Sequence, residues 1–467
     1  MLPAMPTPTT PEVSAPTAAH APLSIATLIA YASPMVAVNF SLVLFMSYVN
    51  KYAVDVLLIP PLAMGLIFGA GRLWDAVTDP ITGVWSDRTE HAWGRRRPWI
   101  AASAIPIALS GWMVWAPPES LSTPQLIAWM TVAVFAFNLA VTIFYTPHQA
   151  LGAELSTDSH VVSRIFAWRQ AAGYVGMIGC LVFGMPALMT ATDRRGLATT
   201  FAIVCGVAVV VSIAISVALL REPAGNRRRG GSSNGAIARD VWRNRYSRKL
   251  LTLILIEHTG SGASMVVAPF LMQYVIGLPG KIGEIFLFYV GSSLLSLPLW
   301  VWLARRIGKK QSWLIGTAAG IAGYACLFFV GEGDLRWMQM VVTLTGACSA
   351  CGNVMGQSIL ADVIDADELE TGERKEGAYY SAFTFLYKTS SGIMAMITGF
   401  TLSWVAFVPN APTQTETTLL AIRSLNALAP LVSMVIGGVI LLGFGLDAAK
   451  HAEIRRALDA RRAARAA

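Results

Sequence analysis

Two aspartates stand one helical turn apart inside a long apolar run of the sequence. The run covers residues 58–85 and contains Arg72, Asp75 and Asp79. At the angular step of an α-helix, these three side chains fall within a sector of roughly 60°. A charged group in a bilayer costs about 3 kcal/mol on insertion scales, and such groups usually mark an ion or proton pathway. The stripe therefore predicts a chain that moves a cation across a membrane.

The helices that must position this stripe are predicted from composition and hydropathy. Of the 467 residues, 55% are hydrophobic and only 13% are charged, whereas a soluble domain carries about a quarter charged residues. Twelve stretches are long enough to cross about 30 Å of hydrocarbon, and they form two sets of six. They cover residues 24–48, 58–85, 99–116, 124–152, 166–191, 199–220, 250–276, 282–304, 312–330, 338–363, 377–406 and 418–446.

The basic residues predict the orientation of the chain. The net charge is +8, and the Lys and Arg residues gather in the loops on one side of the predicted spans. The positive-inside rule then places both termini and the central linker in the cytoplasm, so this charge does not indicate nucleic acid. The predicted order is a disordered tail (1–22), a first bundle (23–220), a basic linker (221–249), a second bundle (250–446) and a basic tail (447–467).

Several functional classes are disfavoured by missing motifs. The five cysteines lie in apolar runs without the spacing of zinc ligands, and no phosphate-binding loop is present. No grouping of a nucleophile with a base emerges. We therefore expect neither an enzyme nor a resident cofactor. We expect an all-α membrane protein with twelve transmembrane helices in two six-helix bundles, the arrangement of the major facilitator fold.

Five stretches, in order along almost the whole chain, resemble the glycoside–pentoside–hexuronide:cation symporter family. They are Gly71–Gly83 (GRLWDAVTDPITG), Trp93–Trp99 (WGRRRPW), Tyr145–Leu155 (YTPHQALGAEL), Ser163–Arg169 (SRIFAWR), and residues 361–381 with the following Lys388. The resemblance implies a secondary symporter with the major facilitator fold.

The resemblance also implies a cation site. It falls on Asp75 and Asp79, which would hold Na⁺ if the protein is sodium-coupled, with Thr142 of the fourth span and Thr78 as further ligands. The family has Asn where this chain has Thr78, which leaves Na⁺ and H⁺ both open as the coupling ion. Arg72, Lys388 and Arg169 would balance the carboxylates. The structural alternative is an Arg–Asp pair that stabilises helix packing.

The substrate is less well defined, because two sugar-binding aspartates of the family are replaced here by Asn39 and Tyr145. Polar and aromatic side chains remain that could bind hydroxyl groups or stack on a sugar ring, although His148 could equally be a packed core residue. These expected substrate residues are Asn39, Tyr145, His148, Gln149, Trp168, Arg169, Gln357, Thr384 and Lys388. The expected cargo is a glycoside, an oligosaccharide or a related sugar, and the alternative is a lipid-like or amphipathic solute.

A cytoplasmic gate is expected where charged residues flank the spans. Asp362 and Asp365 would pair with Arg95 and Arg96, unless these acidic side chains are simply solvated. Glu257 and the adjacent His258 are not explained by the family pattern, and could extend the polar lining of the cavity or pair with Lys388 or Arg423. We expect a monomer in a bacterial-type inner (plasma) membrane, with a small-molecule substrate and lipid as its partners.

Overall fold

The computed structural model describes residues 24–156, 158–220, 222, 241–373 and 375–466. The predicted N-terminal tail and most of the predicted linker lie outside these residues. The first half contains α1 (Ile25–Ala32), α2 (Pro34–Asp55), α3 (Pro61–Arg88), α4 (Arg97–Trp115), α5 (Thr123–Glu154), α6 (Ser159–Gly179), η1 (Cys180–Gly184), α7 (Met185–Thr190) and α8 (Arg194–Leu219). The second half contains α10 (Arg245–Phe270), η2 (Leu271–Val275), η3 (Pro279–Lys281), α11 (Ile282–Ile307), α12 (Lys309–Leu327), α13 (Leu335–Thr371), α14 (Glu376–Trp404), α15 (Glu416–Leu442) and α16 (Ala448–Ala466).

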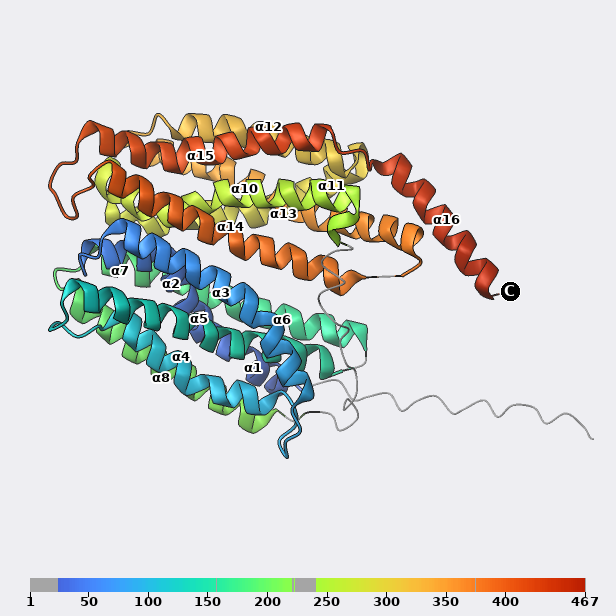
Figure 1. Cartoon of the computed structure of the whole chain (residues 1–467), viewed down its shortest axis with the longest axis horizontal. Coiled ribbons are helices and arrows are strands. Elements are labelled where there is room, and N and C mark those ends of the chain that lie inside the picture. The colour runs from blue at the N-terminus through green and yellow to red at the C-terminus, as the bar shows by residue number, and fades with distance from the viewer. Residues whose placement is uncertain (1–23, 157, 221, 223–240, 374, 467) are drawn as a thin grey trace, which may run out of the picture.

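These elements form two helical bundles that lie side by side, the first drawn in blue to green and the second in yellow-green to red (Figure 1). Within the described residues, α1 with α2, α6 with η1 and α7, and α10 with η2 run on as continuous rods, which makes twelve rods before α16. Eight rods are long and apolar enough to cross a membrane. The rod α3 is not among them, because Arg72, Asp75 and Asp79 lower its hydropathy. The predicted fold class is confirmed.

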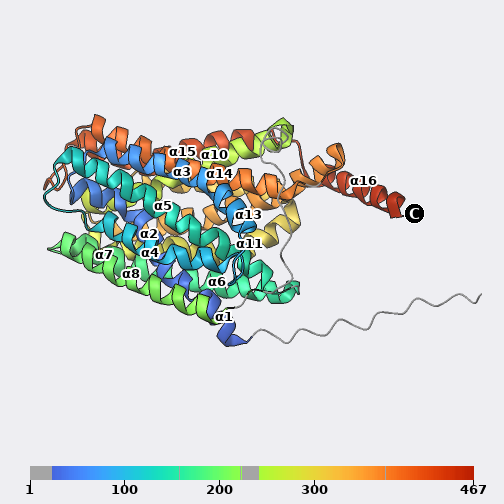
Figure 2. The same cartoon turned by 60° about the horizontal axis from the view of Figure 1, so that its bottom comes forward.

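Several boundaries differ from the sequence prediction: α6 begins at Ser159 and α13 ends at Thr371, beyond the spans expected at 166–191 and 338–363, and α2 and α10 are longer too. The helix α2 continues to Asp55, so Lys51, expected in a loop, is a buried helical residue. The helix α10 begins at Arg245, inside the predicted linker, because the side chain of Asn244 accepts hydrogen bonds from the backbone of Tyr246 and Ser247 and caps the helix. α16 extends beyond the bundles at one end of the molecule in both views (Figures 1 and 2). We call this end the termini end and the opposite one the loop end.

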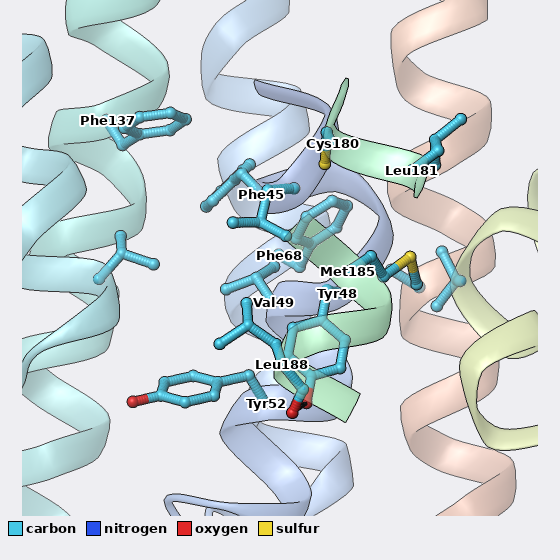
Figure 3. Close-up of a cluster of buried hydrophobic side chains, with 14 of the residues drawn as sticks. Phe45, Tyr48, Val49, Tyr52, Phe68, Phe137, Cys180, Leu181, Met185 and Leu188 are labelled. Carbon is cyan, nitrogen blue, oxygen red and sulfur yellow. Dashed lines mark hydrogen bonds between the residues drawn. The ribbon is translucent and has the colours of Figure 1, made fainter. Parts of the chain in front are cut away.

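Buried aromatic and aliphatic side chains hold the first bundle together. Figure 3 shows Phe45, Tyr48 and Tyr52 of α2 packed with Phe68 of α3 and Leu188 of α7. Every one of these side chains is at most 1% exposed. The buried hydroxyl of Tyr52 has a hydrogen-bond partner, since it donates to the carbonyl oxygen of Trp115 at 2.8 Å.

The two bundles meet most closely where α3 runs beside α14. Glycines allow this approach: a Cβ atom on Gly65 would lie 2.7 Å from the carbonyl oxygen of Ala395, and one on Gly399 would lie 2.4 Å from that of Pro61. Between described residues, the hydrogen bonds and ion pairs that join the bundles run from the loop end only as far as Lys388. Among the described residues, the bundles are thus latched at the loop end.

Candidate functional site

The charged stripe of α3 lies at the contact between the bundles, midway along the helix. Lys388 of α14 places its ammonium 2.9 Å from Asp75 Oδ2 and 2.5 Å from Asp79 Oδ2. Arg72 contributes a further contact, with Nη1 3.3 Å from Asp75 Oδ2 and Nε 3.3 Å from the Ser391 hydroxyl. Two positive and two negative side chains therefore meet in one largely buried cluster, as a low-dielectric site requires.

Thr142 of α5 completes this cluster from the opposite side. Its Oγ1 lies 2.6 Å from Asp75 Oδ1 and 2.9 Å from Asp79 Oδ1. A hydroxyl carries a single proton and can donate to only one of these oxygens at a time. Three oxygen atoms consequently converge with one proton among them, which is the donor set that a hard cation or an additional proton would complete.

Thr78, predicted as a cation ligand, uses its hydroxyl within its own helix. It donates to the backbone carbonyl of Asp75 at 3.2 Å, the usual back-bond of a threonine inside a helix. Asn138 lies one turn before Thr142 on α5 and is buried, and a Cβ atom on Gly71 would meet its amide nitrogen at 2.9 Å. Gly71 thus makes room for a second polar side chain beside the carboxylates.

A separate polar group lies in the first bundle. Tyr145 donates to Asn39 Oδ1 at 2.7 Å, and the Arg169 guanidinium lies 5.4 Å from the Tyr145 ring centre. His148 is fully buried, and its ring stacks between Tyr31 and Phe144, with ring centres 4.3 and 4.8 Å away.

These contacts correct two expectations. Arg169 does not balance the aspartates in this conformation, because its Nε lies 3.4 Å from His148 Nδ1 instead. His148 is not free to meet a solute, since one ring nitrogen faces Arg169 and Nε2 lies 2.9 Å from the Tyr31 carbonyl oxygen. The remaining predicted substrate residues, Gln149, Trp168, Gln357 and Thr384, are exposed.

The predicted cytoplasmic gate pairs are wrong for this conformation. Asp362 binds Lys309 at 2.7 Å, and Asp365 lies 3.1 Å from His451 of α16, all within the second half of the chain. In the first bundle, Arg95 lies 2.6 Å from Glu154. Arg96 contacts the same glutamate at 3.3 Å and also pairs with Asp87. In the part of the chain that the structure describes, each of these four charged side chains thus has a partner in its own half.

A latch that the sequence analysis missed joins the bundles at the loop end. Lys51 and Asp55 of α2 form a buried ion pair at 2.5 Å, and Tyr274 of η2 donates to Asp55 Oδ2 at 2.9 Å. The Lys51 ammonium lies 4.5 Å from the Tyr274 ring centre, and Asn410 hydrogen-bonds to the Asp55 carbonyl. The signal in the sequence was an i,i+4 Lys–Asp pair beside an apolar run, the same kind of signal that identified Asp75 and Asp79.

Fold and site together define a secondary transporter with the major facilitator fold. The chain belongs to the family described as MFS/sugar transport protein, whose model matches residues 30–448. It is therefore a polytopic integral membrane protein.

Relatives match the chain over most of its length. A symporter from Synechocystis is 26% identical and aligns over 89% of this chain and 93% of its own. A proposed sulfoquinovose importer of Salmonella typhimurium is 26% identical and aligns over 87% of this chain and 86% of its own. A sodium-dependent lysophosphatidylcholine symporter of Danio rerio is 23% identical and aligns over 89% of this chain and 86% of its own. Among solved structures, a variant of the nucleoside transporter NupG superposes with a TM-score of 0.67 at 12% identity, covering 90% of this chain and 99% of that one.

Proposed function

We propose that the protein is a Na⁺-coupled symporter for a glycoside or a related sugar, and that Asp75, Asp79 and Thr142 hold the cation. The observation that carries this proposal is the convergence of the three side-chain oxygens on one point between α3 and α5. Oxygen donors suit a hard cation such as Na⁺. Several relatives named as sodium-dependent symporters support Na⁺ over H⁺.

In this proposal, Lys388 stands in for the cation when the site is empty. Its ammonium already contacts both aspartates, and Arg72 supplies the second positive charge. Na⁺ must therefore displace the Lys388 ammonium from the two aspartates, which releases α14 from its ion pairs with α3. Because binding free energies are reciprocal, a substrate that favours the displaced lysine also strengthens Na⁺ binding, and this reciprocity is the basis of coupling.

The orientation follows from the basic loops, which we propose lie in the cytoplasm together with both termini. The termini end is then the cytoplasmic end, and the latch of Lys51, Asp55 and Tyr274 closes the outer end. The structure would thus represent a state open toward the cytoplasm. We propose a monomer in a bacterial-type inner membrane.

A sugar is the first choice of cargo, supported by the description of the family and by the relative named as a sulfoquinovose importer. A lysolipid is the second candidate. It is favoured by the lysophosphatidylcholine symporters among the relatives, and by the neutral Asn39–Tyr145 pair, which stands where the sugar-binding family members carry carboxylates.

Thermal unfolding of the purified protein, in NaCl or choline chloride at two pH values, tests the cation. A ligand at 100 times its Kd stabilises the folded state by about 2.7 kcal/mol. We expect Na⁺ to stabilise the wild type and Asp459→Asn, whose carboxylate is exposed on α16, but not Asp79→Asn. If the thermal stability of the protein changes with pH but not with Na⁺, the coupling ion is H⁺ instead.

Uptake into proteoliposomes under a Na⁺ gradient tests the cargo. A panel of labelled glycosides is compared with labelled lysophosphatidylcholine, in the wild type and in Asp79→Asn. Sugar uptake that requires both the gradient and Asp79 supports the first candidate. Uptake of the lysolipid alone would replace it with the second.

A further inference from the structure

The second bundle contains a polar cavity that is distinct from the cation cluster. It lies among α10, α12, α13, α14 and α15, and its lining includes Glu257, His258, Trp313, Ser349, Asn353 and Phe383. No residue of α3 or α5 lines it, and neither does Lys388. Asn353 is exposed, whereas Trp313 is buried, so the cavity leads from an accessible amide into the bundle.

Glu257 is the acidic group of this cavity. Its Oε1 atom is buried and has no hydrogen-bond partner among the described residues. The same oxygen would lie 2.7 Å from a Cβ atom on Gly437, so it is inside the bundle, while the Trp313 indole lies on the side of the carboxylate that faces Gly352. One oxygen of a largely buried carboxylate therefore lacks a donor, which is an energetically costly arrangement unless a ligand supplies one.

The two basic side chains considered from the sequence do not supply that donor. Lys388 is held by Asp75 and Asp79 on the opposite bundle. Arg423 lies on α15 fourteen residues before Gly437, a distance of about 21 Å along the helix. The second carboxylate oxygen, Oε2, lies on the side of the cavity, because Gly352 lines the cavity and a Cβ atom there would be 3.7 Å from Oε2. Glu257 can therefore accept a hydrogen bond from a donor that enters through the cavity.

The surrounding side chains indicate the chemistry of such a ligand. Aromatic rings of Trp313, His258 and Phe383 line the cavity, and Ser349 and Asn353 add neutral polar groups. A carboxylate that accepts from hydroxyl groups, next to an aromatic face that packs on carbon-bound hydrogens, matches a sugar ring. In the first bundle, Asn39 and Tyr145 stand where the family resemblance implies sugar-binding carboxylates, and these two neutral side chains bond to each other.

We propose that Glu257 is the substrate-binding carboxylate of this transporter and that it accepts hydrogen bonds from sugar hydroxyls inside the second bundle. This inference rests on the proposed sugar transport. A contact on α14 connects the cavity to the cation site: the His258 ring lies 4.8 Å from that of Tyr387, which directly precedes Lys388. A sugar bound at Glu257 therefore lies next to a histidine whose ring contacts α14, the helix that carries Lys388.

The test compares ligand binding in three purified proteins: the wild type, Glu257→Gln and Glu284→Gln. Glu284 undergoes the same substitution at the loop end, outside the cavity. The probes are 4-nitrophenyl glucosides, galactosides, xylosides and glucuronides, with lysophosphatidylcholine as a separate arm. Because a hydrogen bond to a charged group is lost, we expect Glu257→Gln to bind the preferred glycoside about 10- to 150-fold more weakly. Glu284→Gln should match the wild type.

Stabilisation by Na⁺ provides the second readout. Glu257→Gln should keep it, because the aspartate cluster is intact, and this shows that the variant is folded. Asn353→Ala, at the accessible part of the cavity, should weaken glycoside binding by a smaller factor than Glu257→Gln. This variant tests the cavity if Glu257→Gln does not fold.

The possible results separate this inference from the proposed function. Equal glycoside binding by the wild type and Glu257→Gln overturns the role of Glu257 and leaves sugar transport standing. A loss confined to lysophosphatidylcholine also overturns it, since the carboxylate would then serve another ligand. If the wild type binds no glycoside at all while Na⁺ still stabilises it, sugar transport and the inference fail together.

Discussion

Replacing Tyr274 by phenylalanine removes the hydroxyl that bridges the two bundles at the loop end and leaves the ring in place. In the structure this hydroxyl donates to Asp55 Oδ2 at 2.9 Å and accepts from the backbone N–H of Asn410 at 3.0 Å. The ring still lies beside the Lys51 ammonium, so packing is preserved. The substitution therefore removes a hydrogen bond to Asp55 that exists only while the loop end is closed, together with the bond from Asn410 within the second half.

The expected effect follows from the charge of the acceptor. A hydrogen bond to a charged group contributes about 1.5–3 kcal/mol. At about 1.4 kcal/mol per factor of ten, its loss should shift the equilibrium toward a state open at the loop end by a factor of about 10 to 150. The combination with Asn410→Gly should shift it further, because the Asn410 side chain also bonds to the Asp55 carbonyl. Glycine tolerates the φ of 57° at that position.

Distances between spin labels on the two bundles report this shift. Ser120 and Thr413 are exposed in loops of the first and second halves, and the five native cysteines are replaced beforehand. Tyr52→Phe is the matched control, since it removes a hydroxyl bond that lies wholly within the first bundle. If Tyr274→Phe gains no more long-distance population than Tyr52→Phe, the latch does not hold the loop end closed and our reasoning is refuted.

Three further substitutions test the cation cluster and the contact between the bundles. Thr142→Val should lower the apparent Na⁺ affinity in thermal titrations by about 10-fold or more, because it removes an oxygen that contacts both aspartates. Thr142→Ser keeps the hydroxyl and should retain most of the affinity. If both variants lose the same Na⁺ affinity, the hydroxyl is not a ligand. Lys388→Met should tighten Na⁺ binding, since the competing ammonium is gone, and should abolish Na⁺-driven uptake in proteoliposomes; weaker Na⁺ binding would contradict the displacement model. Gly399→Ala should open the loop end in the spin-label measurement, because its Cβ would meet the Pro61 carbonyl at 2.4 Å, whereas Gly377→Ala on the same helix meets nothing within 4 Å and should have no effect.

Helix boundaries were predictable because each is set by local chemistry. The eighth span was expected to begin at residue 282, and α11 begins at Ile282. The charged stripe was visible for the same reason, since the cost of placing Asp75 and Asp79 in an apolar helix does not depend on any neighbour. The end of α2 was misplaced because Lys51 and Asp55 look like loop residues until their partner on η2 is known.

Contacts between helices were predicted less well. His148 has the residue type of a ligand, yet Tyr31 and Phe144 enclose it, and this depends on how α1 packs near α5. Asp362 and Arg95 were expected to meet across the bundles, but each pairs within its own half. Such pairs depend on how two packed bundles lie against each other, and local sequence patterns do not specify that arrangement.

The sequence by itself determined that this chain crosses a membrane in two sets of helices, that it carries a carboxylate pair in the apolar helix α3, and which family it belongs to. These properties follow from hydropathy, spacing and motif, all of which are local. Only the tertiary structure decided that Lys388 and Thr142 close on that pair, that a latch seals the loop end, and that Glu257 has an oxygen without a donor. Each of these depends on distances of a few ångströms between segments far apart in the chain, and those distances are set by packing.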